Sequence, residues 1–165
     1  MWPFPKSTVS EKNNLVKLFN DALTVISKKQ FAGSLNYETA FTFIKCPNAA
    51  GQSLDSVVQK ALGDKASIGG SNQISSDQLV SDFYDKVSHP GDHGSHPNMN
   101  YMEGSSFKDD LSSASVYLKT FLDDASLIIS FRIKDGHPFY PVFWDFSFMI
   151  ESGDDSYLFI GSSSD

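Results

Sequence analysis

The sequence predicts an α+β domain in which N-terminal helices pack on a C-terminal antiparallel β-meander of three or more strands. Three segments with apolar residues at helical spacing follow one another before His89. From Leu127 onward the apolar residues alternate along the chain and are separated by turn residues, which is typical of strands. A length of 165 residues suits one domain that covers residues 1–165.

The first helix is expected from Val9 to Lys29. Thr8 and Glu11 have the spacing of a capping box, in which the hydroxyl and the carboxylate each satisfy a free backbone N–H at the helix start. Two lysines at its end complement the helix dipole. We expect residues 1–8 to form a loose N-terminal arm.

Two more helices are expected before the middle of the chain. Ser53 precedes the second helix, and Gly63 stops it. Ser75 precedes the third, and Pro90 ends it. The stretch 67–72 between them contains two glycines and two serines, and we expect a loop there.

Two segments are ambiguous. Residues 40–44 form a short apolar run that predicts a strand or a connector. Residues 107–122 carry leucines at helical spacing but also alternate as a strand would, and their length and acidic first turn favour a helix. The preceding residues, 89–105, form a long connection rich in glycine, proline and histidine, which suggests a functional or mobile loop.

The C-terminal strands are expected at 127–133, 139–150 and 157–161. Asp135 and Gly136 predict a two-residue hairpin turn between the first two. Alternation gives the middle strand two faces. The face expected to pack on the helices carries Tyr140, Val142, Trp144, Phe146, Phe148 and Ile150. The other face is half aromatic and half polar, is expected to be an interaction surface, and carries Phe139, Phe143, Asp145, Ser147 and Met149.

Charge is unevenly distributed along the chain, whose net charge is −7. Residues 1–70 carry eight lysines against five acids, or +3, and residues 71–165 carry five cations against fifteen acids, or −10. A strongly acidic half repels phosphate, so we expect no nucleic-acid partner. It would attract a cationic protein and accelerate their encounter. The alternative is that acidic loops only keep the protein in solution.

The cellular compartment is indicated by what the sequence lacks. Cys46 is the one cysteine, so no intrachain disulfide can form. The first residues have neither the basic nor the apolar region of a secretory signal, and no stretch approaches the roughly 18 apolar residues of a membrane span. We expect a cytoplasmic protein without a membrane partner.

Candidate chemistry is confined to the histidine-containing connection. His89, His93 and His96 lie near Asp92, and such side chains can ligate zinc. No helix holds them on one face, so a polar loop is the favoured interpretation. The sequence has no Gly-x-Ser-x-Gly motif. We expect neither a cofactor nor a catalytic residue, and keep as an alternative a small enzyme or metal-binding protein that uses this loop.

Acidic pairs recur in the C-terminal half at 109–110, 123–124 and 154–155. Each falls at an element start or a turn, where aspartate also caps backbone donors. Their concentration in one half favours a binding role. Together with the mixed face of the middle strand they provide the expected partner-binding residues, which are Asp109, Asp110, Asp123, Asp124, Phe139, Phe143, Asp145 and Glu151.

An aromatic meander, Phe-Tyr-Pro-Val-Phe-Trp-Asp-Phe at 139–146, and the closing Phe-Ile-Gly-Ser-Ser-Ser-Asp at 159–165 carry a family resemblance. In this C-terminal region the chain resembles bacterial toxin-immunity proteins, the small partners encoded beside contact-dependent or polymorphic toxins. The resemblance implies a stoichiometric inhibitor of a cognate toxin domain, and many such toxins are cationic nucleases. It does not specify the fold. A housekeeping adaptor with an acidic face is the further alternative.

Overall fold

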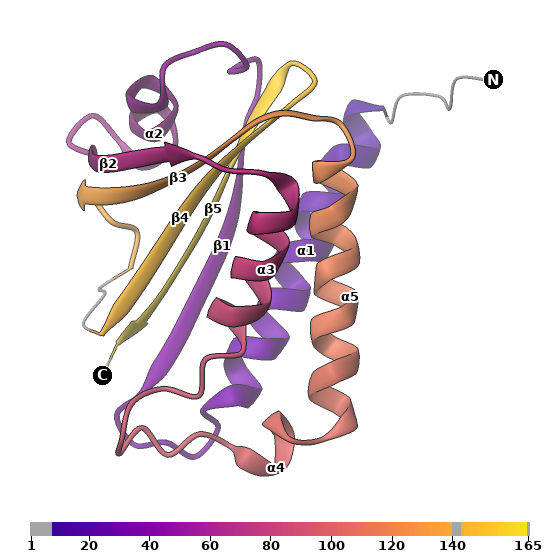
Figure 1. The fold of residues 1–165 in the computed structure, drawn as a ribbon, viewed down its shortest axis with the longest axis vertical. Helices are drawn as coiled ribbons and strands as arrows, with labels where there is room; N and C mark the ends of the chain where they lie inside the picture. Colours follow the sequence, from indigo (N-terminus) through magenta and orange to yellow (C-terminus); the bar gives the residue numbers. More distant parts are fainter. Residues whose placement is uncertain (1–7, 140–142, 165) are drawn as a thin grey trace.

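The computed structural model describes residues 8–139 and 143–164 and contains one five-stranded sheet with helices on both faces (Figure 1). The strand order is β1-β5-β4-β3-β2, and every neighbouring pair is antiparallel. The predicted α+β class is confirmed. The elements are α1 (Val9–Gln30), β1 (Glu38–Cys46), α2 (Leu54–Leu62), β2 (Ser67–Gln73), α3 (Ser76–Val87), α4 (Met99–Met102), α5 (Ser105–Leu122), β3 (Ala125–Asp135), β4 (Trp144–Ser152) and β5 (Asp155–Ser164).

Two cores of unequal size lie on the two faces of the sheet. Helices α1, α3 and α5 cover one face, and α2 covers part of the other (Figure 1). The larger core is mainly aromatic on the sheet side, where it includes Phe43, Phe146, Phe148, Tyr157 and Phe159. The smaller core under α2 is mainly aliphatic and includes Val57, Val58, Ile133, Met149, Leu158 and Ile160.

The predicted helix starts are confirmed. The Thr8 hydroxyl accepts the N–H of Glu11, and the Glu11 carboxylate accepts the N–H of Thr8 at 2.6 Å. Ser53 and Ser75 each accept a backbone N–H at the starts of α2 and α3. The ambiguous segment 107–122 belongs to α5, so the helical interpretation is confirmed. The helix begins at Ser105, however, so the acidic residues lie beyond its first turn, and the expected acidic first turn is wrong.

Strand β1 contains the apolar run at 40–44 and forms one edge of the sheet. It pairs with β5 along its whole length, from Glu38 opposite Ser164 to Cys46 opposite Ser156. The side-chain amide of Asn20 in α1 donates to the Phe43 carbonyl at 2.8 Å and accepts the Phe43 N–H at 2.8 Å. These two bonds attach α1 to the strand and close the middle of an otherwise open edge.

The loop predicted at 67–72 is wrong, because these residues belong to strand β2 at the other edge of the sheet. Ser71 lies opposite Phe131 and Asn72 opposite Ser130, and the register shifts on both sides of Ile68. Glycine, serine and asparagine have a low strand propensity, so the sequence carries no signal for this strand. Backbone pairing with β3 holds it in place.

The connection at 89–105 is irregular except for the short helix α4. Gln30, at the end of α1, is fully buried beneath it. Its side chain donates to the Val87 carbonyl and accepts the Thr39 hydroxyl at 3.1 Å. Its backbone carbonyl accepts the Asn98 N–H at 2.7 Å. The ends of α1 and α3, the start of β1 and the connection are thus held together by one side chain and its backbone.

The two-residue hairpin predicted at Asp135 and Gly136 is wrong. Strand β3 ends at Asp135, but β4 begins at Trp144 rather than at Phe139. Strand β3 pairs with β4 only as far as Phe131, whereas along its other edge the pairing with β2 continues to Asp135. The facing ends of β3 and β4 therefore separate, and a tight turn cannot join them.

The apolar face predicted for the middle strand is confirmed for its described members. Trp144, Phe146, Phe148 and Ile150 belong to the larger core or pack against it. Tyr140 and Val142 lie outside the described residues.

The mixed face of the same strand is not an open surface along its length, which corrects the expectation. Ser147 and Met149 are buried, and Met149 belongs to the core under α2. Alternation within one strand cannot show this, because both faces of a sheet can be covered by other elements.

The N-terminal arm expected at 1–8 falls outside the described residues except for Thr8, which caps α1. Within the described part of the chain, no helix combines the length and the apolar character needed to cross a membrane.

Gly161 in β5 provides a test of how closely the larger core is packed. A Cβ there would lie 2.5 Å from the Phe146 ring and 2.7 Å from the Phe41 ring. We expect Gly161→Ala to lower the free energy of unfolding by about 1–3 kcal/mol, because overpacking forces buried rings to shift. Urea unfolding followed by circular dichroism measures the change.

The control is Gly70→Ala, because a Cβ at Gly70 would meet nothing within 4 Å. It should change the free energy of unfolding by no more than about 0.5 kcal/mol. Equal effects of the two substitutions would contradict close packing around β5.

Candidate functional site

Three predicted partner-binding residues lie near the end of the sheet where β4 turns into β5. Asp123 and Asp124 follow α5 directly, and pairing of β3 with β4 places Leu127 opposite Glu151. Asp154 lies in the turn itself, and together with Asp124 it lines a hollow of about 340 Å³. We call Asp123, Asp124, Glu151 and Asp154 the acidic end.

No ion pair of the described ranges 8–139 and 143–164 includes a carboxylate of the acidic end. Lys12 of α1 lines the same hollow as Asp124 and Asp154. Asp123, Asp124 and Asp154 are exposed. Glu151 is half-buried, and its carboxylate accepts the Ser126 hydroxyl at 3.4 Å. Neighbouring like charges repel one another, so a cationic group placed here would be attracted by several carboxylates at once.

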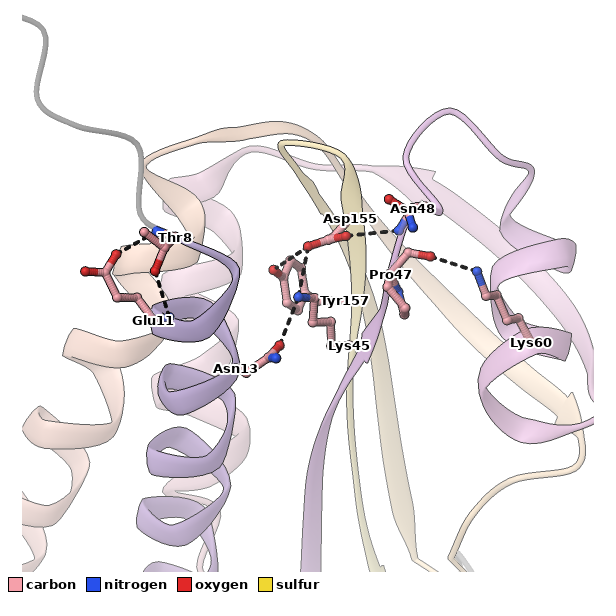
Figure 2. Close-up of polar contacts among 9 residues, drawn as sticks. All are labelled: Thr8, Glu11, Asn13, Lys45, Pro47, Asn48, Lys60, Asp155 and Tyr157. Atoms are coloured by element: carbon pink, nitrogen blue, oxygen red, sulfur yellow. Dashed lines mark hydrogen bonds and ion pairs between the residues drawn. The ribbon is translucent and has the colours of Figure 1, made fainter.

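Lys45 and Asp155, the residue after Asp154, form an ion pair that is largely shielded from solvent (Figure 2). The Lys45 ammonium is 3.2 Å from the Asp155 carboxylate, and the two side chains are only 14% and 13% exposed. Asp155 also accepts the Asn48 N–H at 3.0 Å and the Tyr157 hydroxyl at 3.5 Å. Asp155 is therefore committed to the fold, unlike Asp154 beside it.

The pKa values at this pair follow from its contacts. Burial by itself would raise the pKa of Asp155, but the Asn48 N–H and the Lys45 ammonium outweigh burial and hold it below its ordinary value. Burial, together with the nearby Asp155 charge, raises the pKa of Tyr157 well above its usual range. Asp155 stays ionised and Tyr157 stays neutral at neutral pH.

Asp109 and Asp110 lie at the other end of α5, about 20 Å from Asp124 at 1.5 Å per helical residue. Asp110 accepts the Lys29 ammonium at 2.9 Å and the Tyr101 hydroxyl at 2.8 Å. Burial would raise the pKa of Asp110, but these two donors lower it overall. Asp110 thus links α1, α4 and α5, whereas Asp109 is exposed.

Asp145 and Phe139 lie on the α2 side of the sheet with a buried histidine between them. The Phe139 N–H donates to His137 Nδ1 at 3.1 Å, and His137 Nε2 is 3.6 Å from Asp145 Oδ2. Burial lowers the pKa of His137, although the Asp145 charge opposes this shift. Asp145 therefore faces a neutral imidazole at neutral pH. Phe139 packs on the smaller core.

Phe143 lies apart from all of these, at the end of the sheet opposite the acidic end. Its ring stacks on Tyr37, with 5.2 Å between centroids and 20° between planes. The side chain is still 44% exposed. The eight predicted residues are therefore distributed over four places in the fold.

Asp154, Lys45 and Tyr37 were not among the predicted binding residues. Asp154 could have been included, because the acidic pair at 154–155 was visible in a turn. Lys45 and Tyr37 carry no signal in the sequence. Their roles arise from partners that are distant along the chain.

The three histidines of the long connection do not converge. His89 Nδ1 accepts the Gly91 N–H at 2.9 Å, and its ring is 5.9 Å from the Trp144 ring. His93 and His96 are exposed. Among the side chains that the structure describes, no group of three or more histidine, cysteine, aspartate or glutamate residues is arranged to hold a metal ion.

Comparisons with known proteins give a fold likeness. The sequence matches no family model and no curated protein. Crystal structures of citrus MAF1 in two space groups are similar, with TM-scores of 0.49 and 0.44. Both have 11% sequence identity, and the alignments cover 90% of this chain and 98% of the other.

The Lys45–Asp155 pair predicts a pH-dependent contribution to stability. Because the folded pKa of Asp155 is depressed, the contribution is present above the unfolded pKa of about 3.9 and is lost as the pH falls through the folded pKa. We expect Asp155→Asn to lower the free energy of unfolding by about 1.5–3 kcal/mol at pH 7. The difference from the unaltered protein should shrink below about pH 4, as measured by urea unfolding across this range.

Asp154→Asn is the matched control for that measurement. Its carboxylate is exposed and takes part in no ion pair within the described residues. We expect a change within about 0.5 kcal/mol at either pH. If Asp154→Asn and Asp155→Asn were equally destabilising, the ion pair would not be the cause.

The histidine arrangement predicts that zinc will not stabilise the protein. A ligand that binds only the folded state raises the melting temperature. We expect no rise with equimolar zinc, in the full chain or in a His93→Ala, His96→Ala variant. Differential scanning calorimetry makes the comparison. A rise that disappears in the variant would support the metal-binding alternative.

Proposed function

We propose that this protein is a non-catalytic binding protein that neutralises a cationic protein partner through an acidic surface. The partner that best fits is a cognate toxin domain, as in the immunity proteins that the C-terminal region resembles. A nuclease is the expected class of toxin, because a nuclease needs a cationic surface to bind its phosphate-rich substrate. An acidic protein that covers such a surface would block access to it.

The acidic end is the observation that carries this proposal. Some acids of the chain have an ion pair within the protein, as Asp110 has with Lys29 and Asp155 has with Lys45. The four acidic-end residues take part in no ion pair of the described part of the protein, although Lys12 lines the same hollow as Asp124 and Asp154. Three of its four carboxylates are exposed. Exposed negative charge gathered at one end of the protein favours electrostatic complementarity with a cationic partner.

Carboxylates that stay exposed in the complex and carboxylates that become desolvated in it should have different effects on binding. Exposed carboxylates act mainly on the rate of encounter and on its salt dependence. A charge that becomes desolvated in the complex acts mainly on dissociation. Replacing one exposed aspartate should therefore weaken binding by only about 0.2–1 kcal/mol. Breaking a pair that is buried in the complex should cost roughly 2–5 kcal/mol.

The test is association with the product of the neighbouring gene, measured by surface plasmon resonance at low and high salt. We expect the association rate to fall as the salt concentration rises, because salt screens the attraction between the acidic end and the cationic partner. Changing all four acidic-end residues to their amides should lower that rate by about tenfold at low salt. The dissociation rate should change much less.

The matched control is Asp64→Asn, an exposed aspartate in the turn after α2. It should leave both rates unchanged. Association that ignores ionic strength, or an interface mapped on α1, would contradict the electrostatic part of the proposal. Turnover of a small substrate that is lost on changing His93 or His96 would replace it with the enzyme alternative.

A further inference from the structure

The connection between β3 and β4 contains one buried ionisable side chain. Among residues 136–139 and 143, the described part of this connection, His137 is the one residue that titrates. Its side chain is only 10% exposed. A charged group is costly to bury unless it is paired. The protonation state of His137 therefore affects how this connection packs.

The neutral imidazole fits its surroundings in one tautomer. The Phe139 N–H donates to Nδ1 at 3.1 Å, so Nδ1 carries no proton. The ring proton is then on Nε2, which lies 3.6 Å from Asp145 Oδ2 and has no hydrogen-bond partner among the described residues. The neutral ring thus bonds to the backbone of Phe139 through Nδ1.

The protonated imidazole cannot keep this arrangement. Both ring nitrogens of a histidine cation carry a proton and are donors, so Nδ1 can no longer accept the Phe139 N–H. The Phe139 carbonyl lies 3.2 Å from the same nitrogen and is an acceptor within its reach. Protonation therefore exchanges one bond for another on the same residue and leaves the Phe139 N–H without its acceptor.

Contacts on either side of His137 fix the connection while the ring is neutral. A Cβ at Gly136 would lie 2.8 Å from Ala66 Cα, so the backbone there lies against the residue before β2. Phe139 packs on the core under α2. Loss of the bond to His137 weakens the hold on Phe139, whereas Gly136 is held by contacts that do not titrate.

The charged surroundings of His137 are limited to one carboxylate. Asp145 of β4, itself 33% exposed, is the charged group that acts on the ring. Strand β2 has no charged residue. In β4 and β5 the other acids, Glu151 and Asp155, lie near the turn between these strands. The charged residues of α2 and of the turn after it are exposed, namely Asp55, Lys60, Asp64 and Lys65. Those of β3 are exposed as well, namely Arg132, Lys134 and Asp135.

Burial has a larger effect on the ring than this carboxylate does. It lowers the pKa of His137 below its ordinary value, although the Asp145 charge and the contact with the Phe139 carbonyl oppose this shift. The fold therefore favours the neutral ring, and binding of a proton destabilises the folded state.

We propose that His137 is an acid-sensitive latch, which holds Phe139 against the core under α2 when it is neutral and releases that residue when it is protonated. The two states differ in which backbone group of Phe139 the ring can bind. The latch is a property of the fold and does not depend on the binding function proposed above.

The experiment follows the ¹⁵N-labelled full chain by NMR from about pH 8 to about pH 4.5, across the range in which histidine titrates. The ring nitrogens of His137 report its protonation. The protection factor of the Phe139 amide, which compares its exchange with that of an unstructured chain at the same pH, reports the bond. We expect His137 to titrate below about pH 6.5 and the protection of Phe139 to fall about tenfold over the same range. Protection that stays constant throughout would overturn the inference, and so would titration of His137 at or above about pH 6.5.

His137→Asn tests whether the proton on the ring is the cause. The asparagine side-chain oxygen can take the place of Nδ1 as acceptor, and it does not titrate. Phe139 should therefore stay protected at both ends of the pH range. Release of Phe139 in acid in this variant would contradict the latch.

Asp145→Asn is a second test, and it keeps the histidine. Without this carboxylate the cation loses its counter-charge, so the pH at which His137 titrates and Phe139 is released should fall. Asp135→Asn, at an exposed site two residues before His137, is the matched control and should leave that pH unchanged. The same midpoint in the two variants would contradict the inference.

The latch also predicts a loss of stability in mild acid. Because the folded pKa of His137 lies below its unfolded value of about 6.5, its contribution to stability is present above that pH. The contribution is lost as the pH falls from there toward the folded pKa. The contribution of Asp155 is lost only below about pH 4, so urea unfolding across the pH range separates the two. The loss in mild acid should be absent from His137→Asn, and an equal loss in both proteins would overturn the latch.

Discussion

Strand β5 is buried on both faces from Ser156 to Ser163, and the arrangement of the other elements depends on it. It lies between β1 and β4 and pairs with each along nearly its whole length. The first half carries large apolar side chains, which fill the cores on the two faces. The second half narrows to glycine and serine, because the rings of Phe41 and Phe146 come within contact of the Gly161 backbone. Both cores therefore form only when the last strand inserts beside the first, which lies more than a hundred residues earlier in the chain.

Polar side chains then attach the helices to this sheet at points where apolar packing alone would not define a position. Asn20 binds the backbone of Phe43 at the middle of β1, and Gln30 binds Val87 and Thr39 at its beginning. At the far end of β1, Lys45 pairs with Asp155. These buried or half-buried groups must find their partners, since an unpaired one is unfavourable. They therefore specify one alignment of α1, β1 and β5.

Contacts within the protein also distinguish acidic residues that stabilise the fold from neighbouring acidic residues that stay exposed. Asp154 and Asp155 are neighbours, yet only Asp155 has a cation and a backbone donor. Asp109 and Asp110 divide in the same way, because Tyr101 and Lys29 reach only Asp110. Tyr37 shows the reverse situation, since its buried hydroxyl has no hydrogen-bond partner among the described residues.

The sequence by itself determined the local elements and the charge. Caps and spacing predict α1, α2 and α3, spacing predicts α5, and alternation predicts the inner parts of β3, β4 and β5, because these signals arise between residues close together in the chain. Tertiary structure alone decided the rest. Strand β2 exists because β3 offers its edge, and the expected hairpin turn is absent because the pairing of β3 with β4 stops at Phe131 and Ser147, before the two strand ends. The eight predicted binding residues lie in four separate places in the fold. Which acid pairs with a lysine, and which face of a strand is covered, depends on contacts between segments that are distant in the sequence.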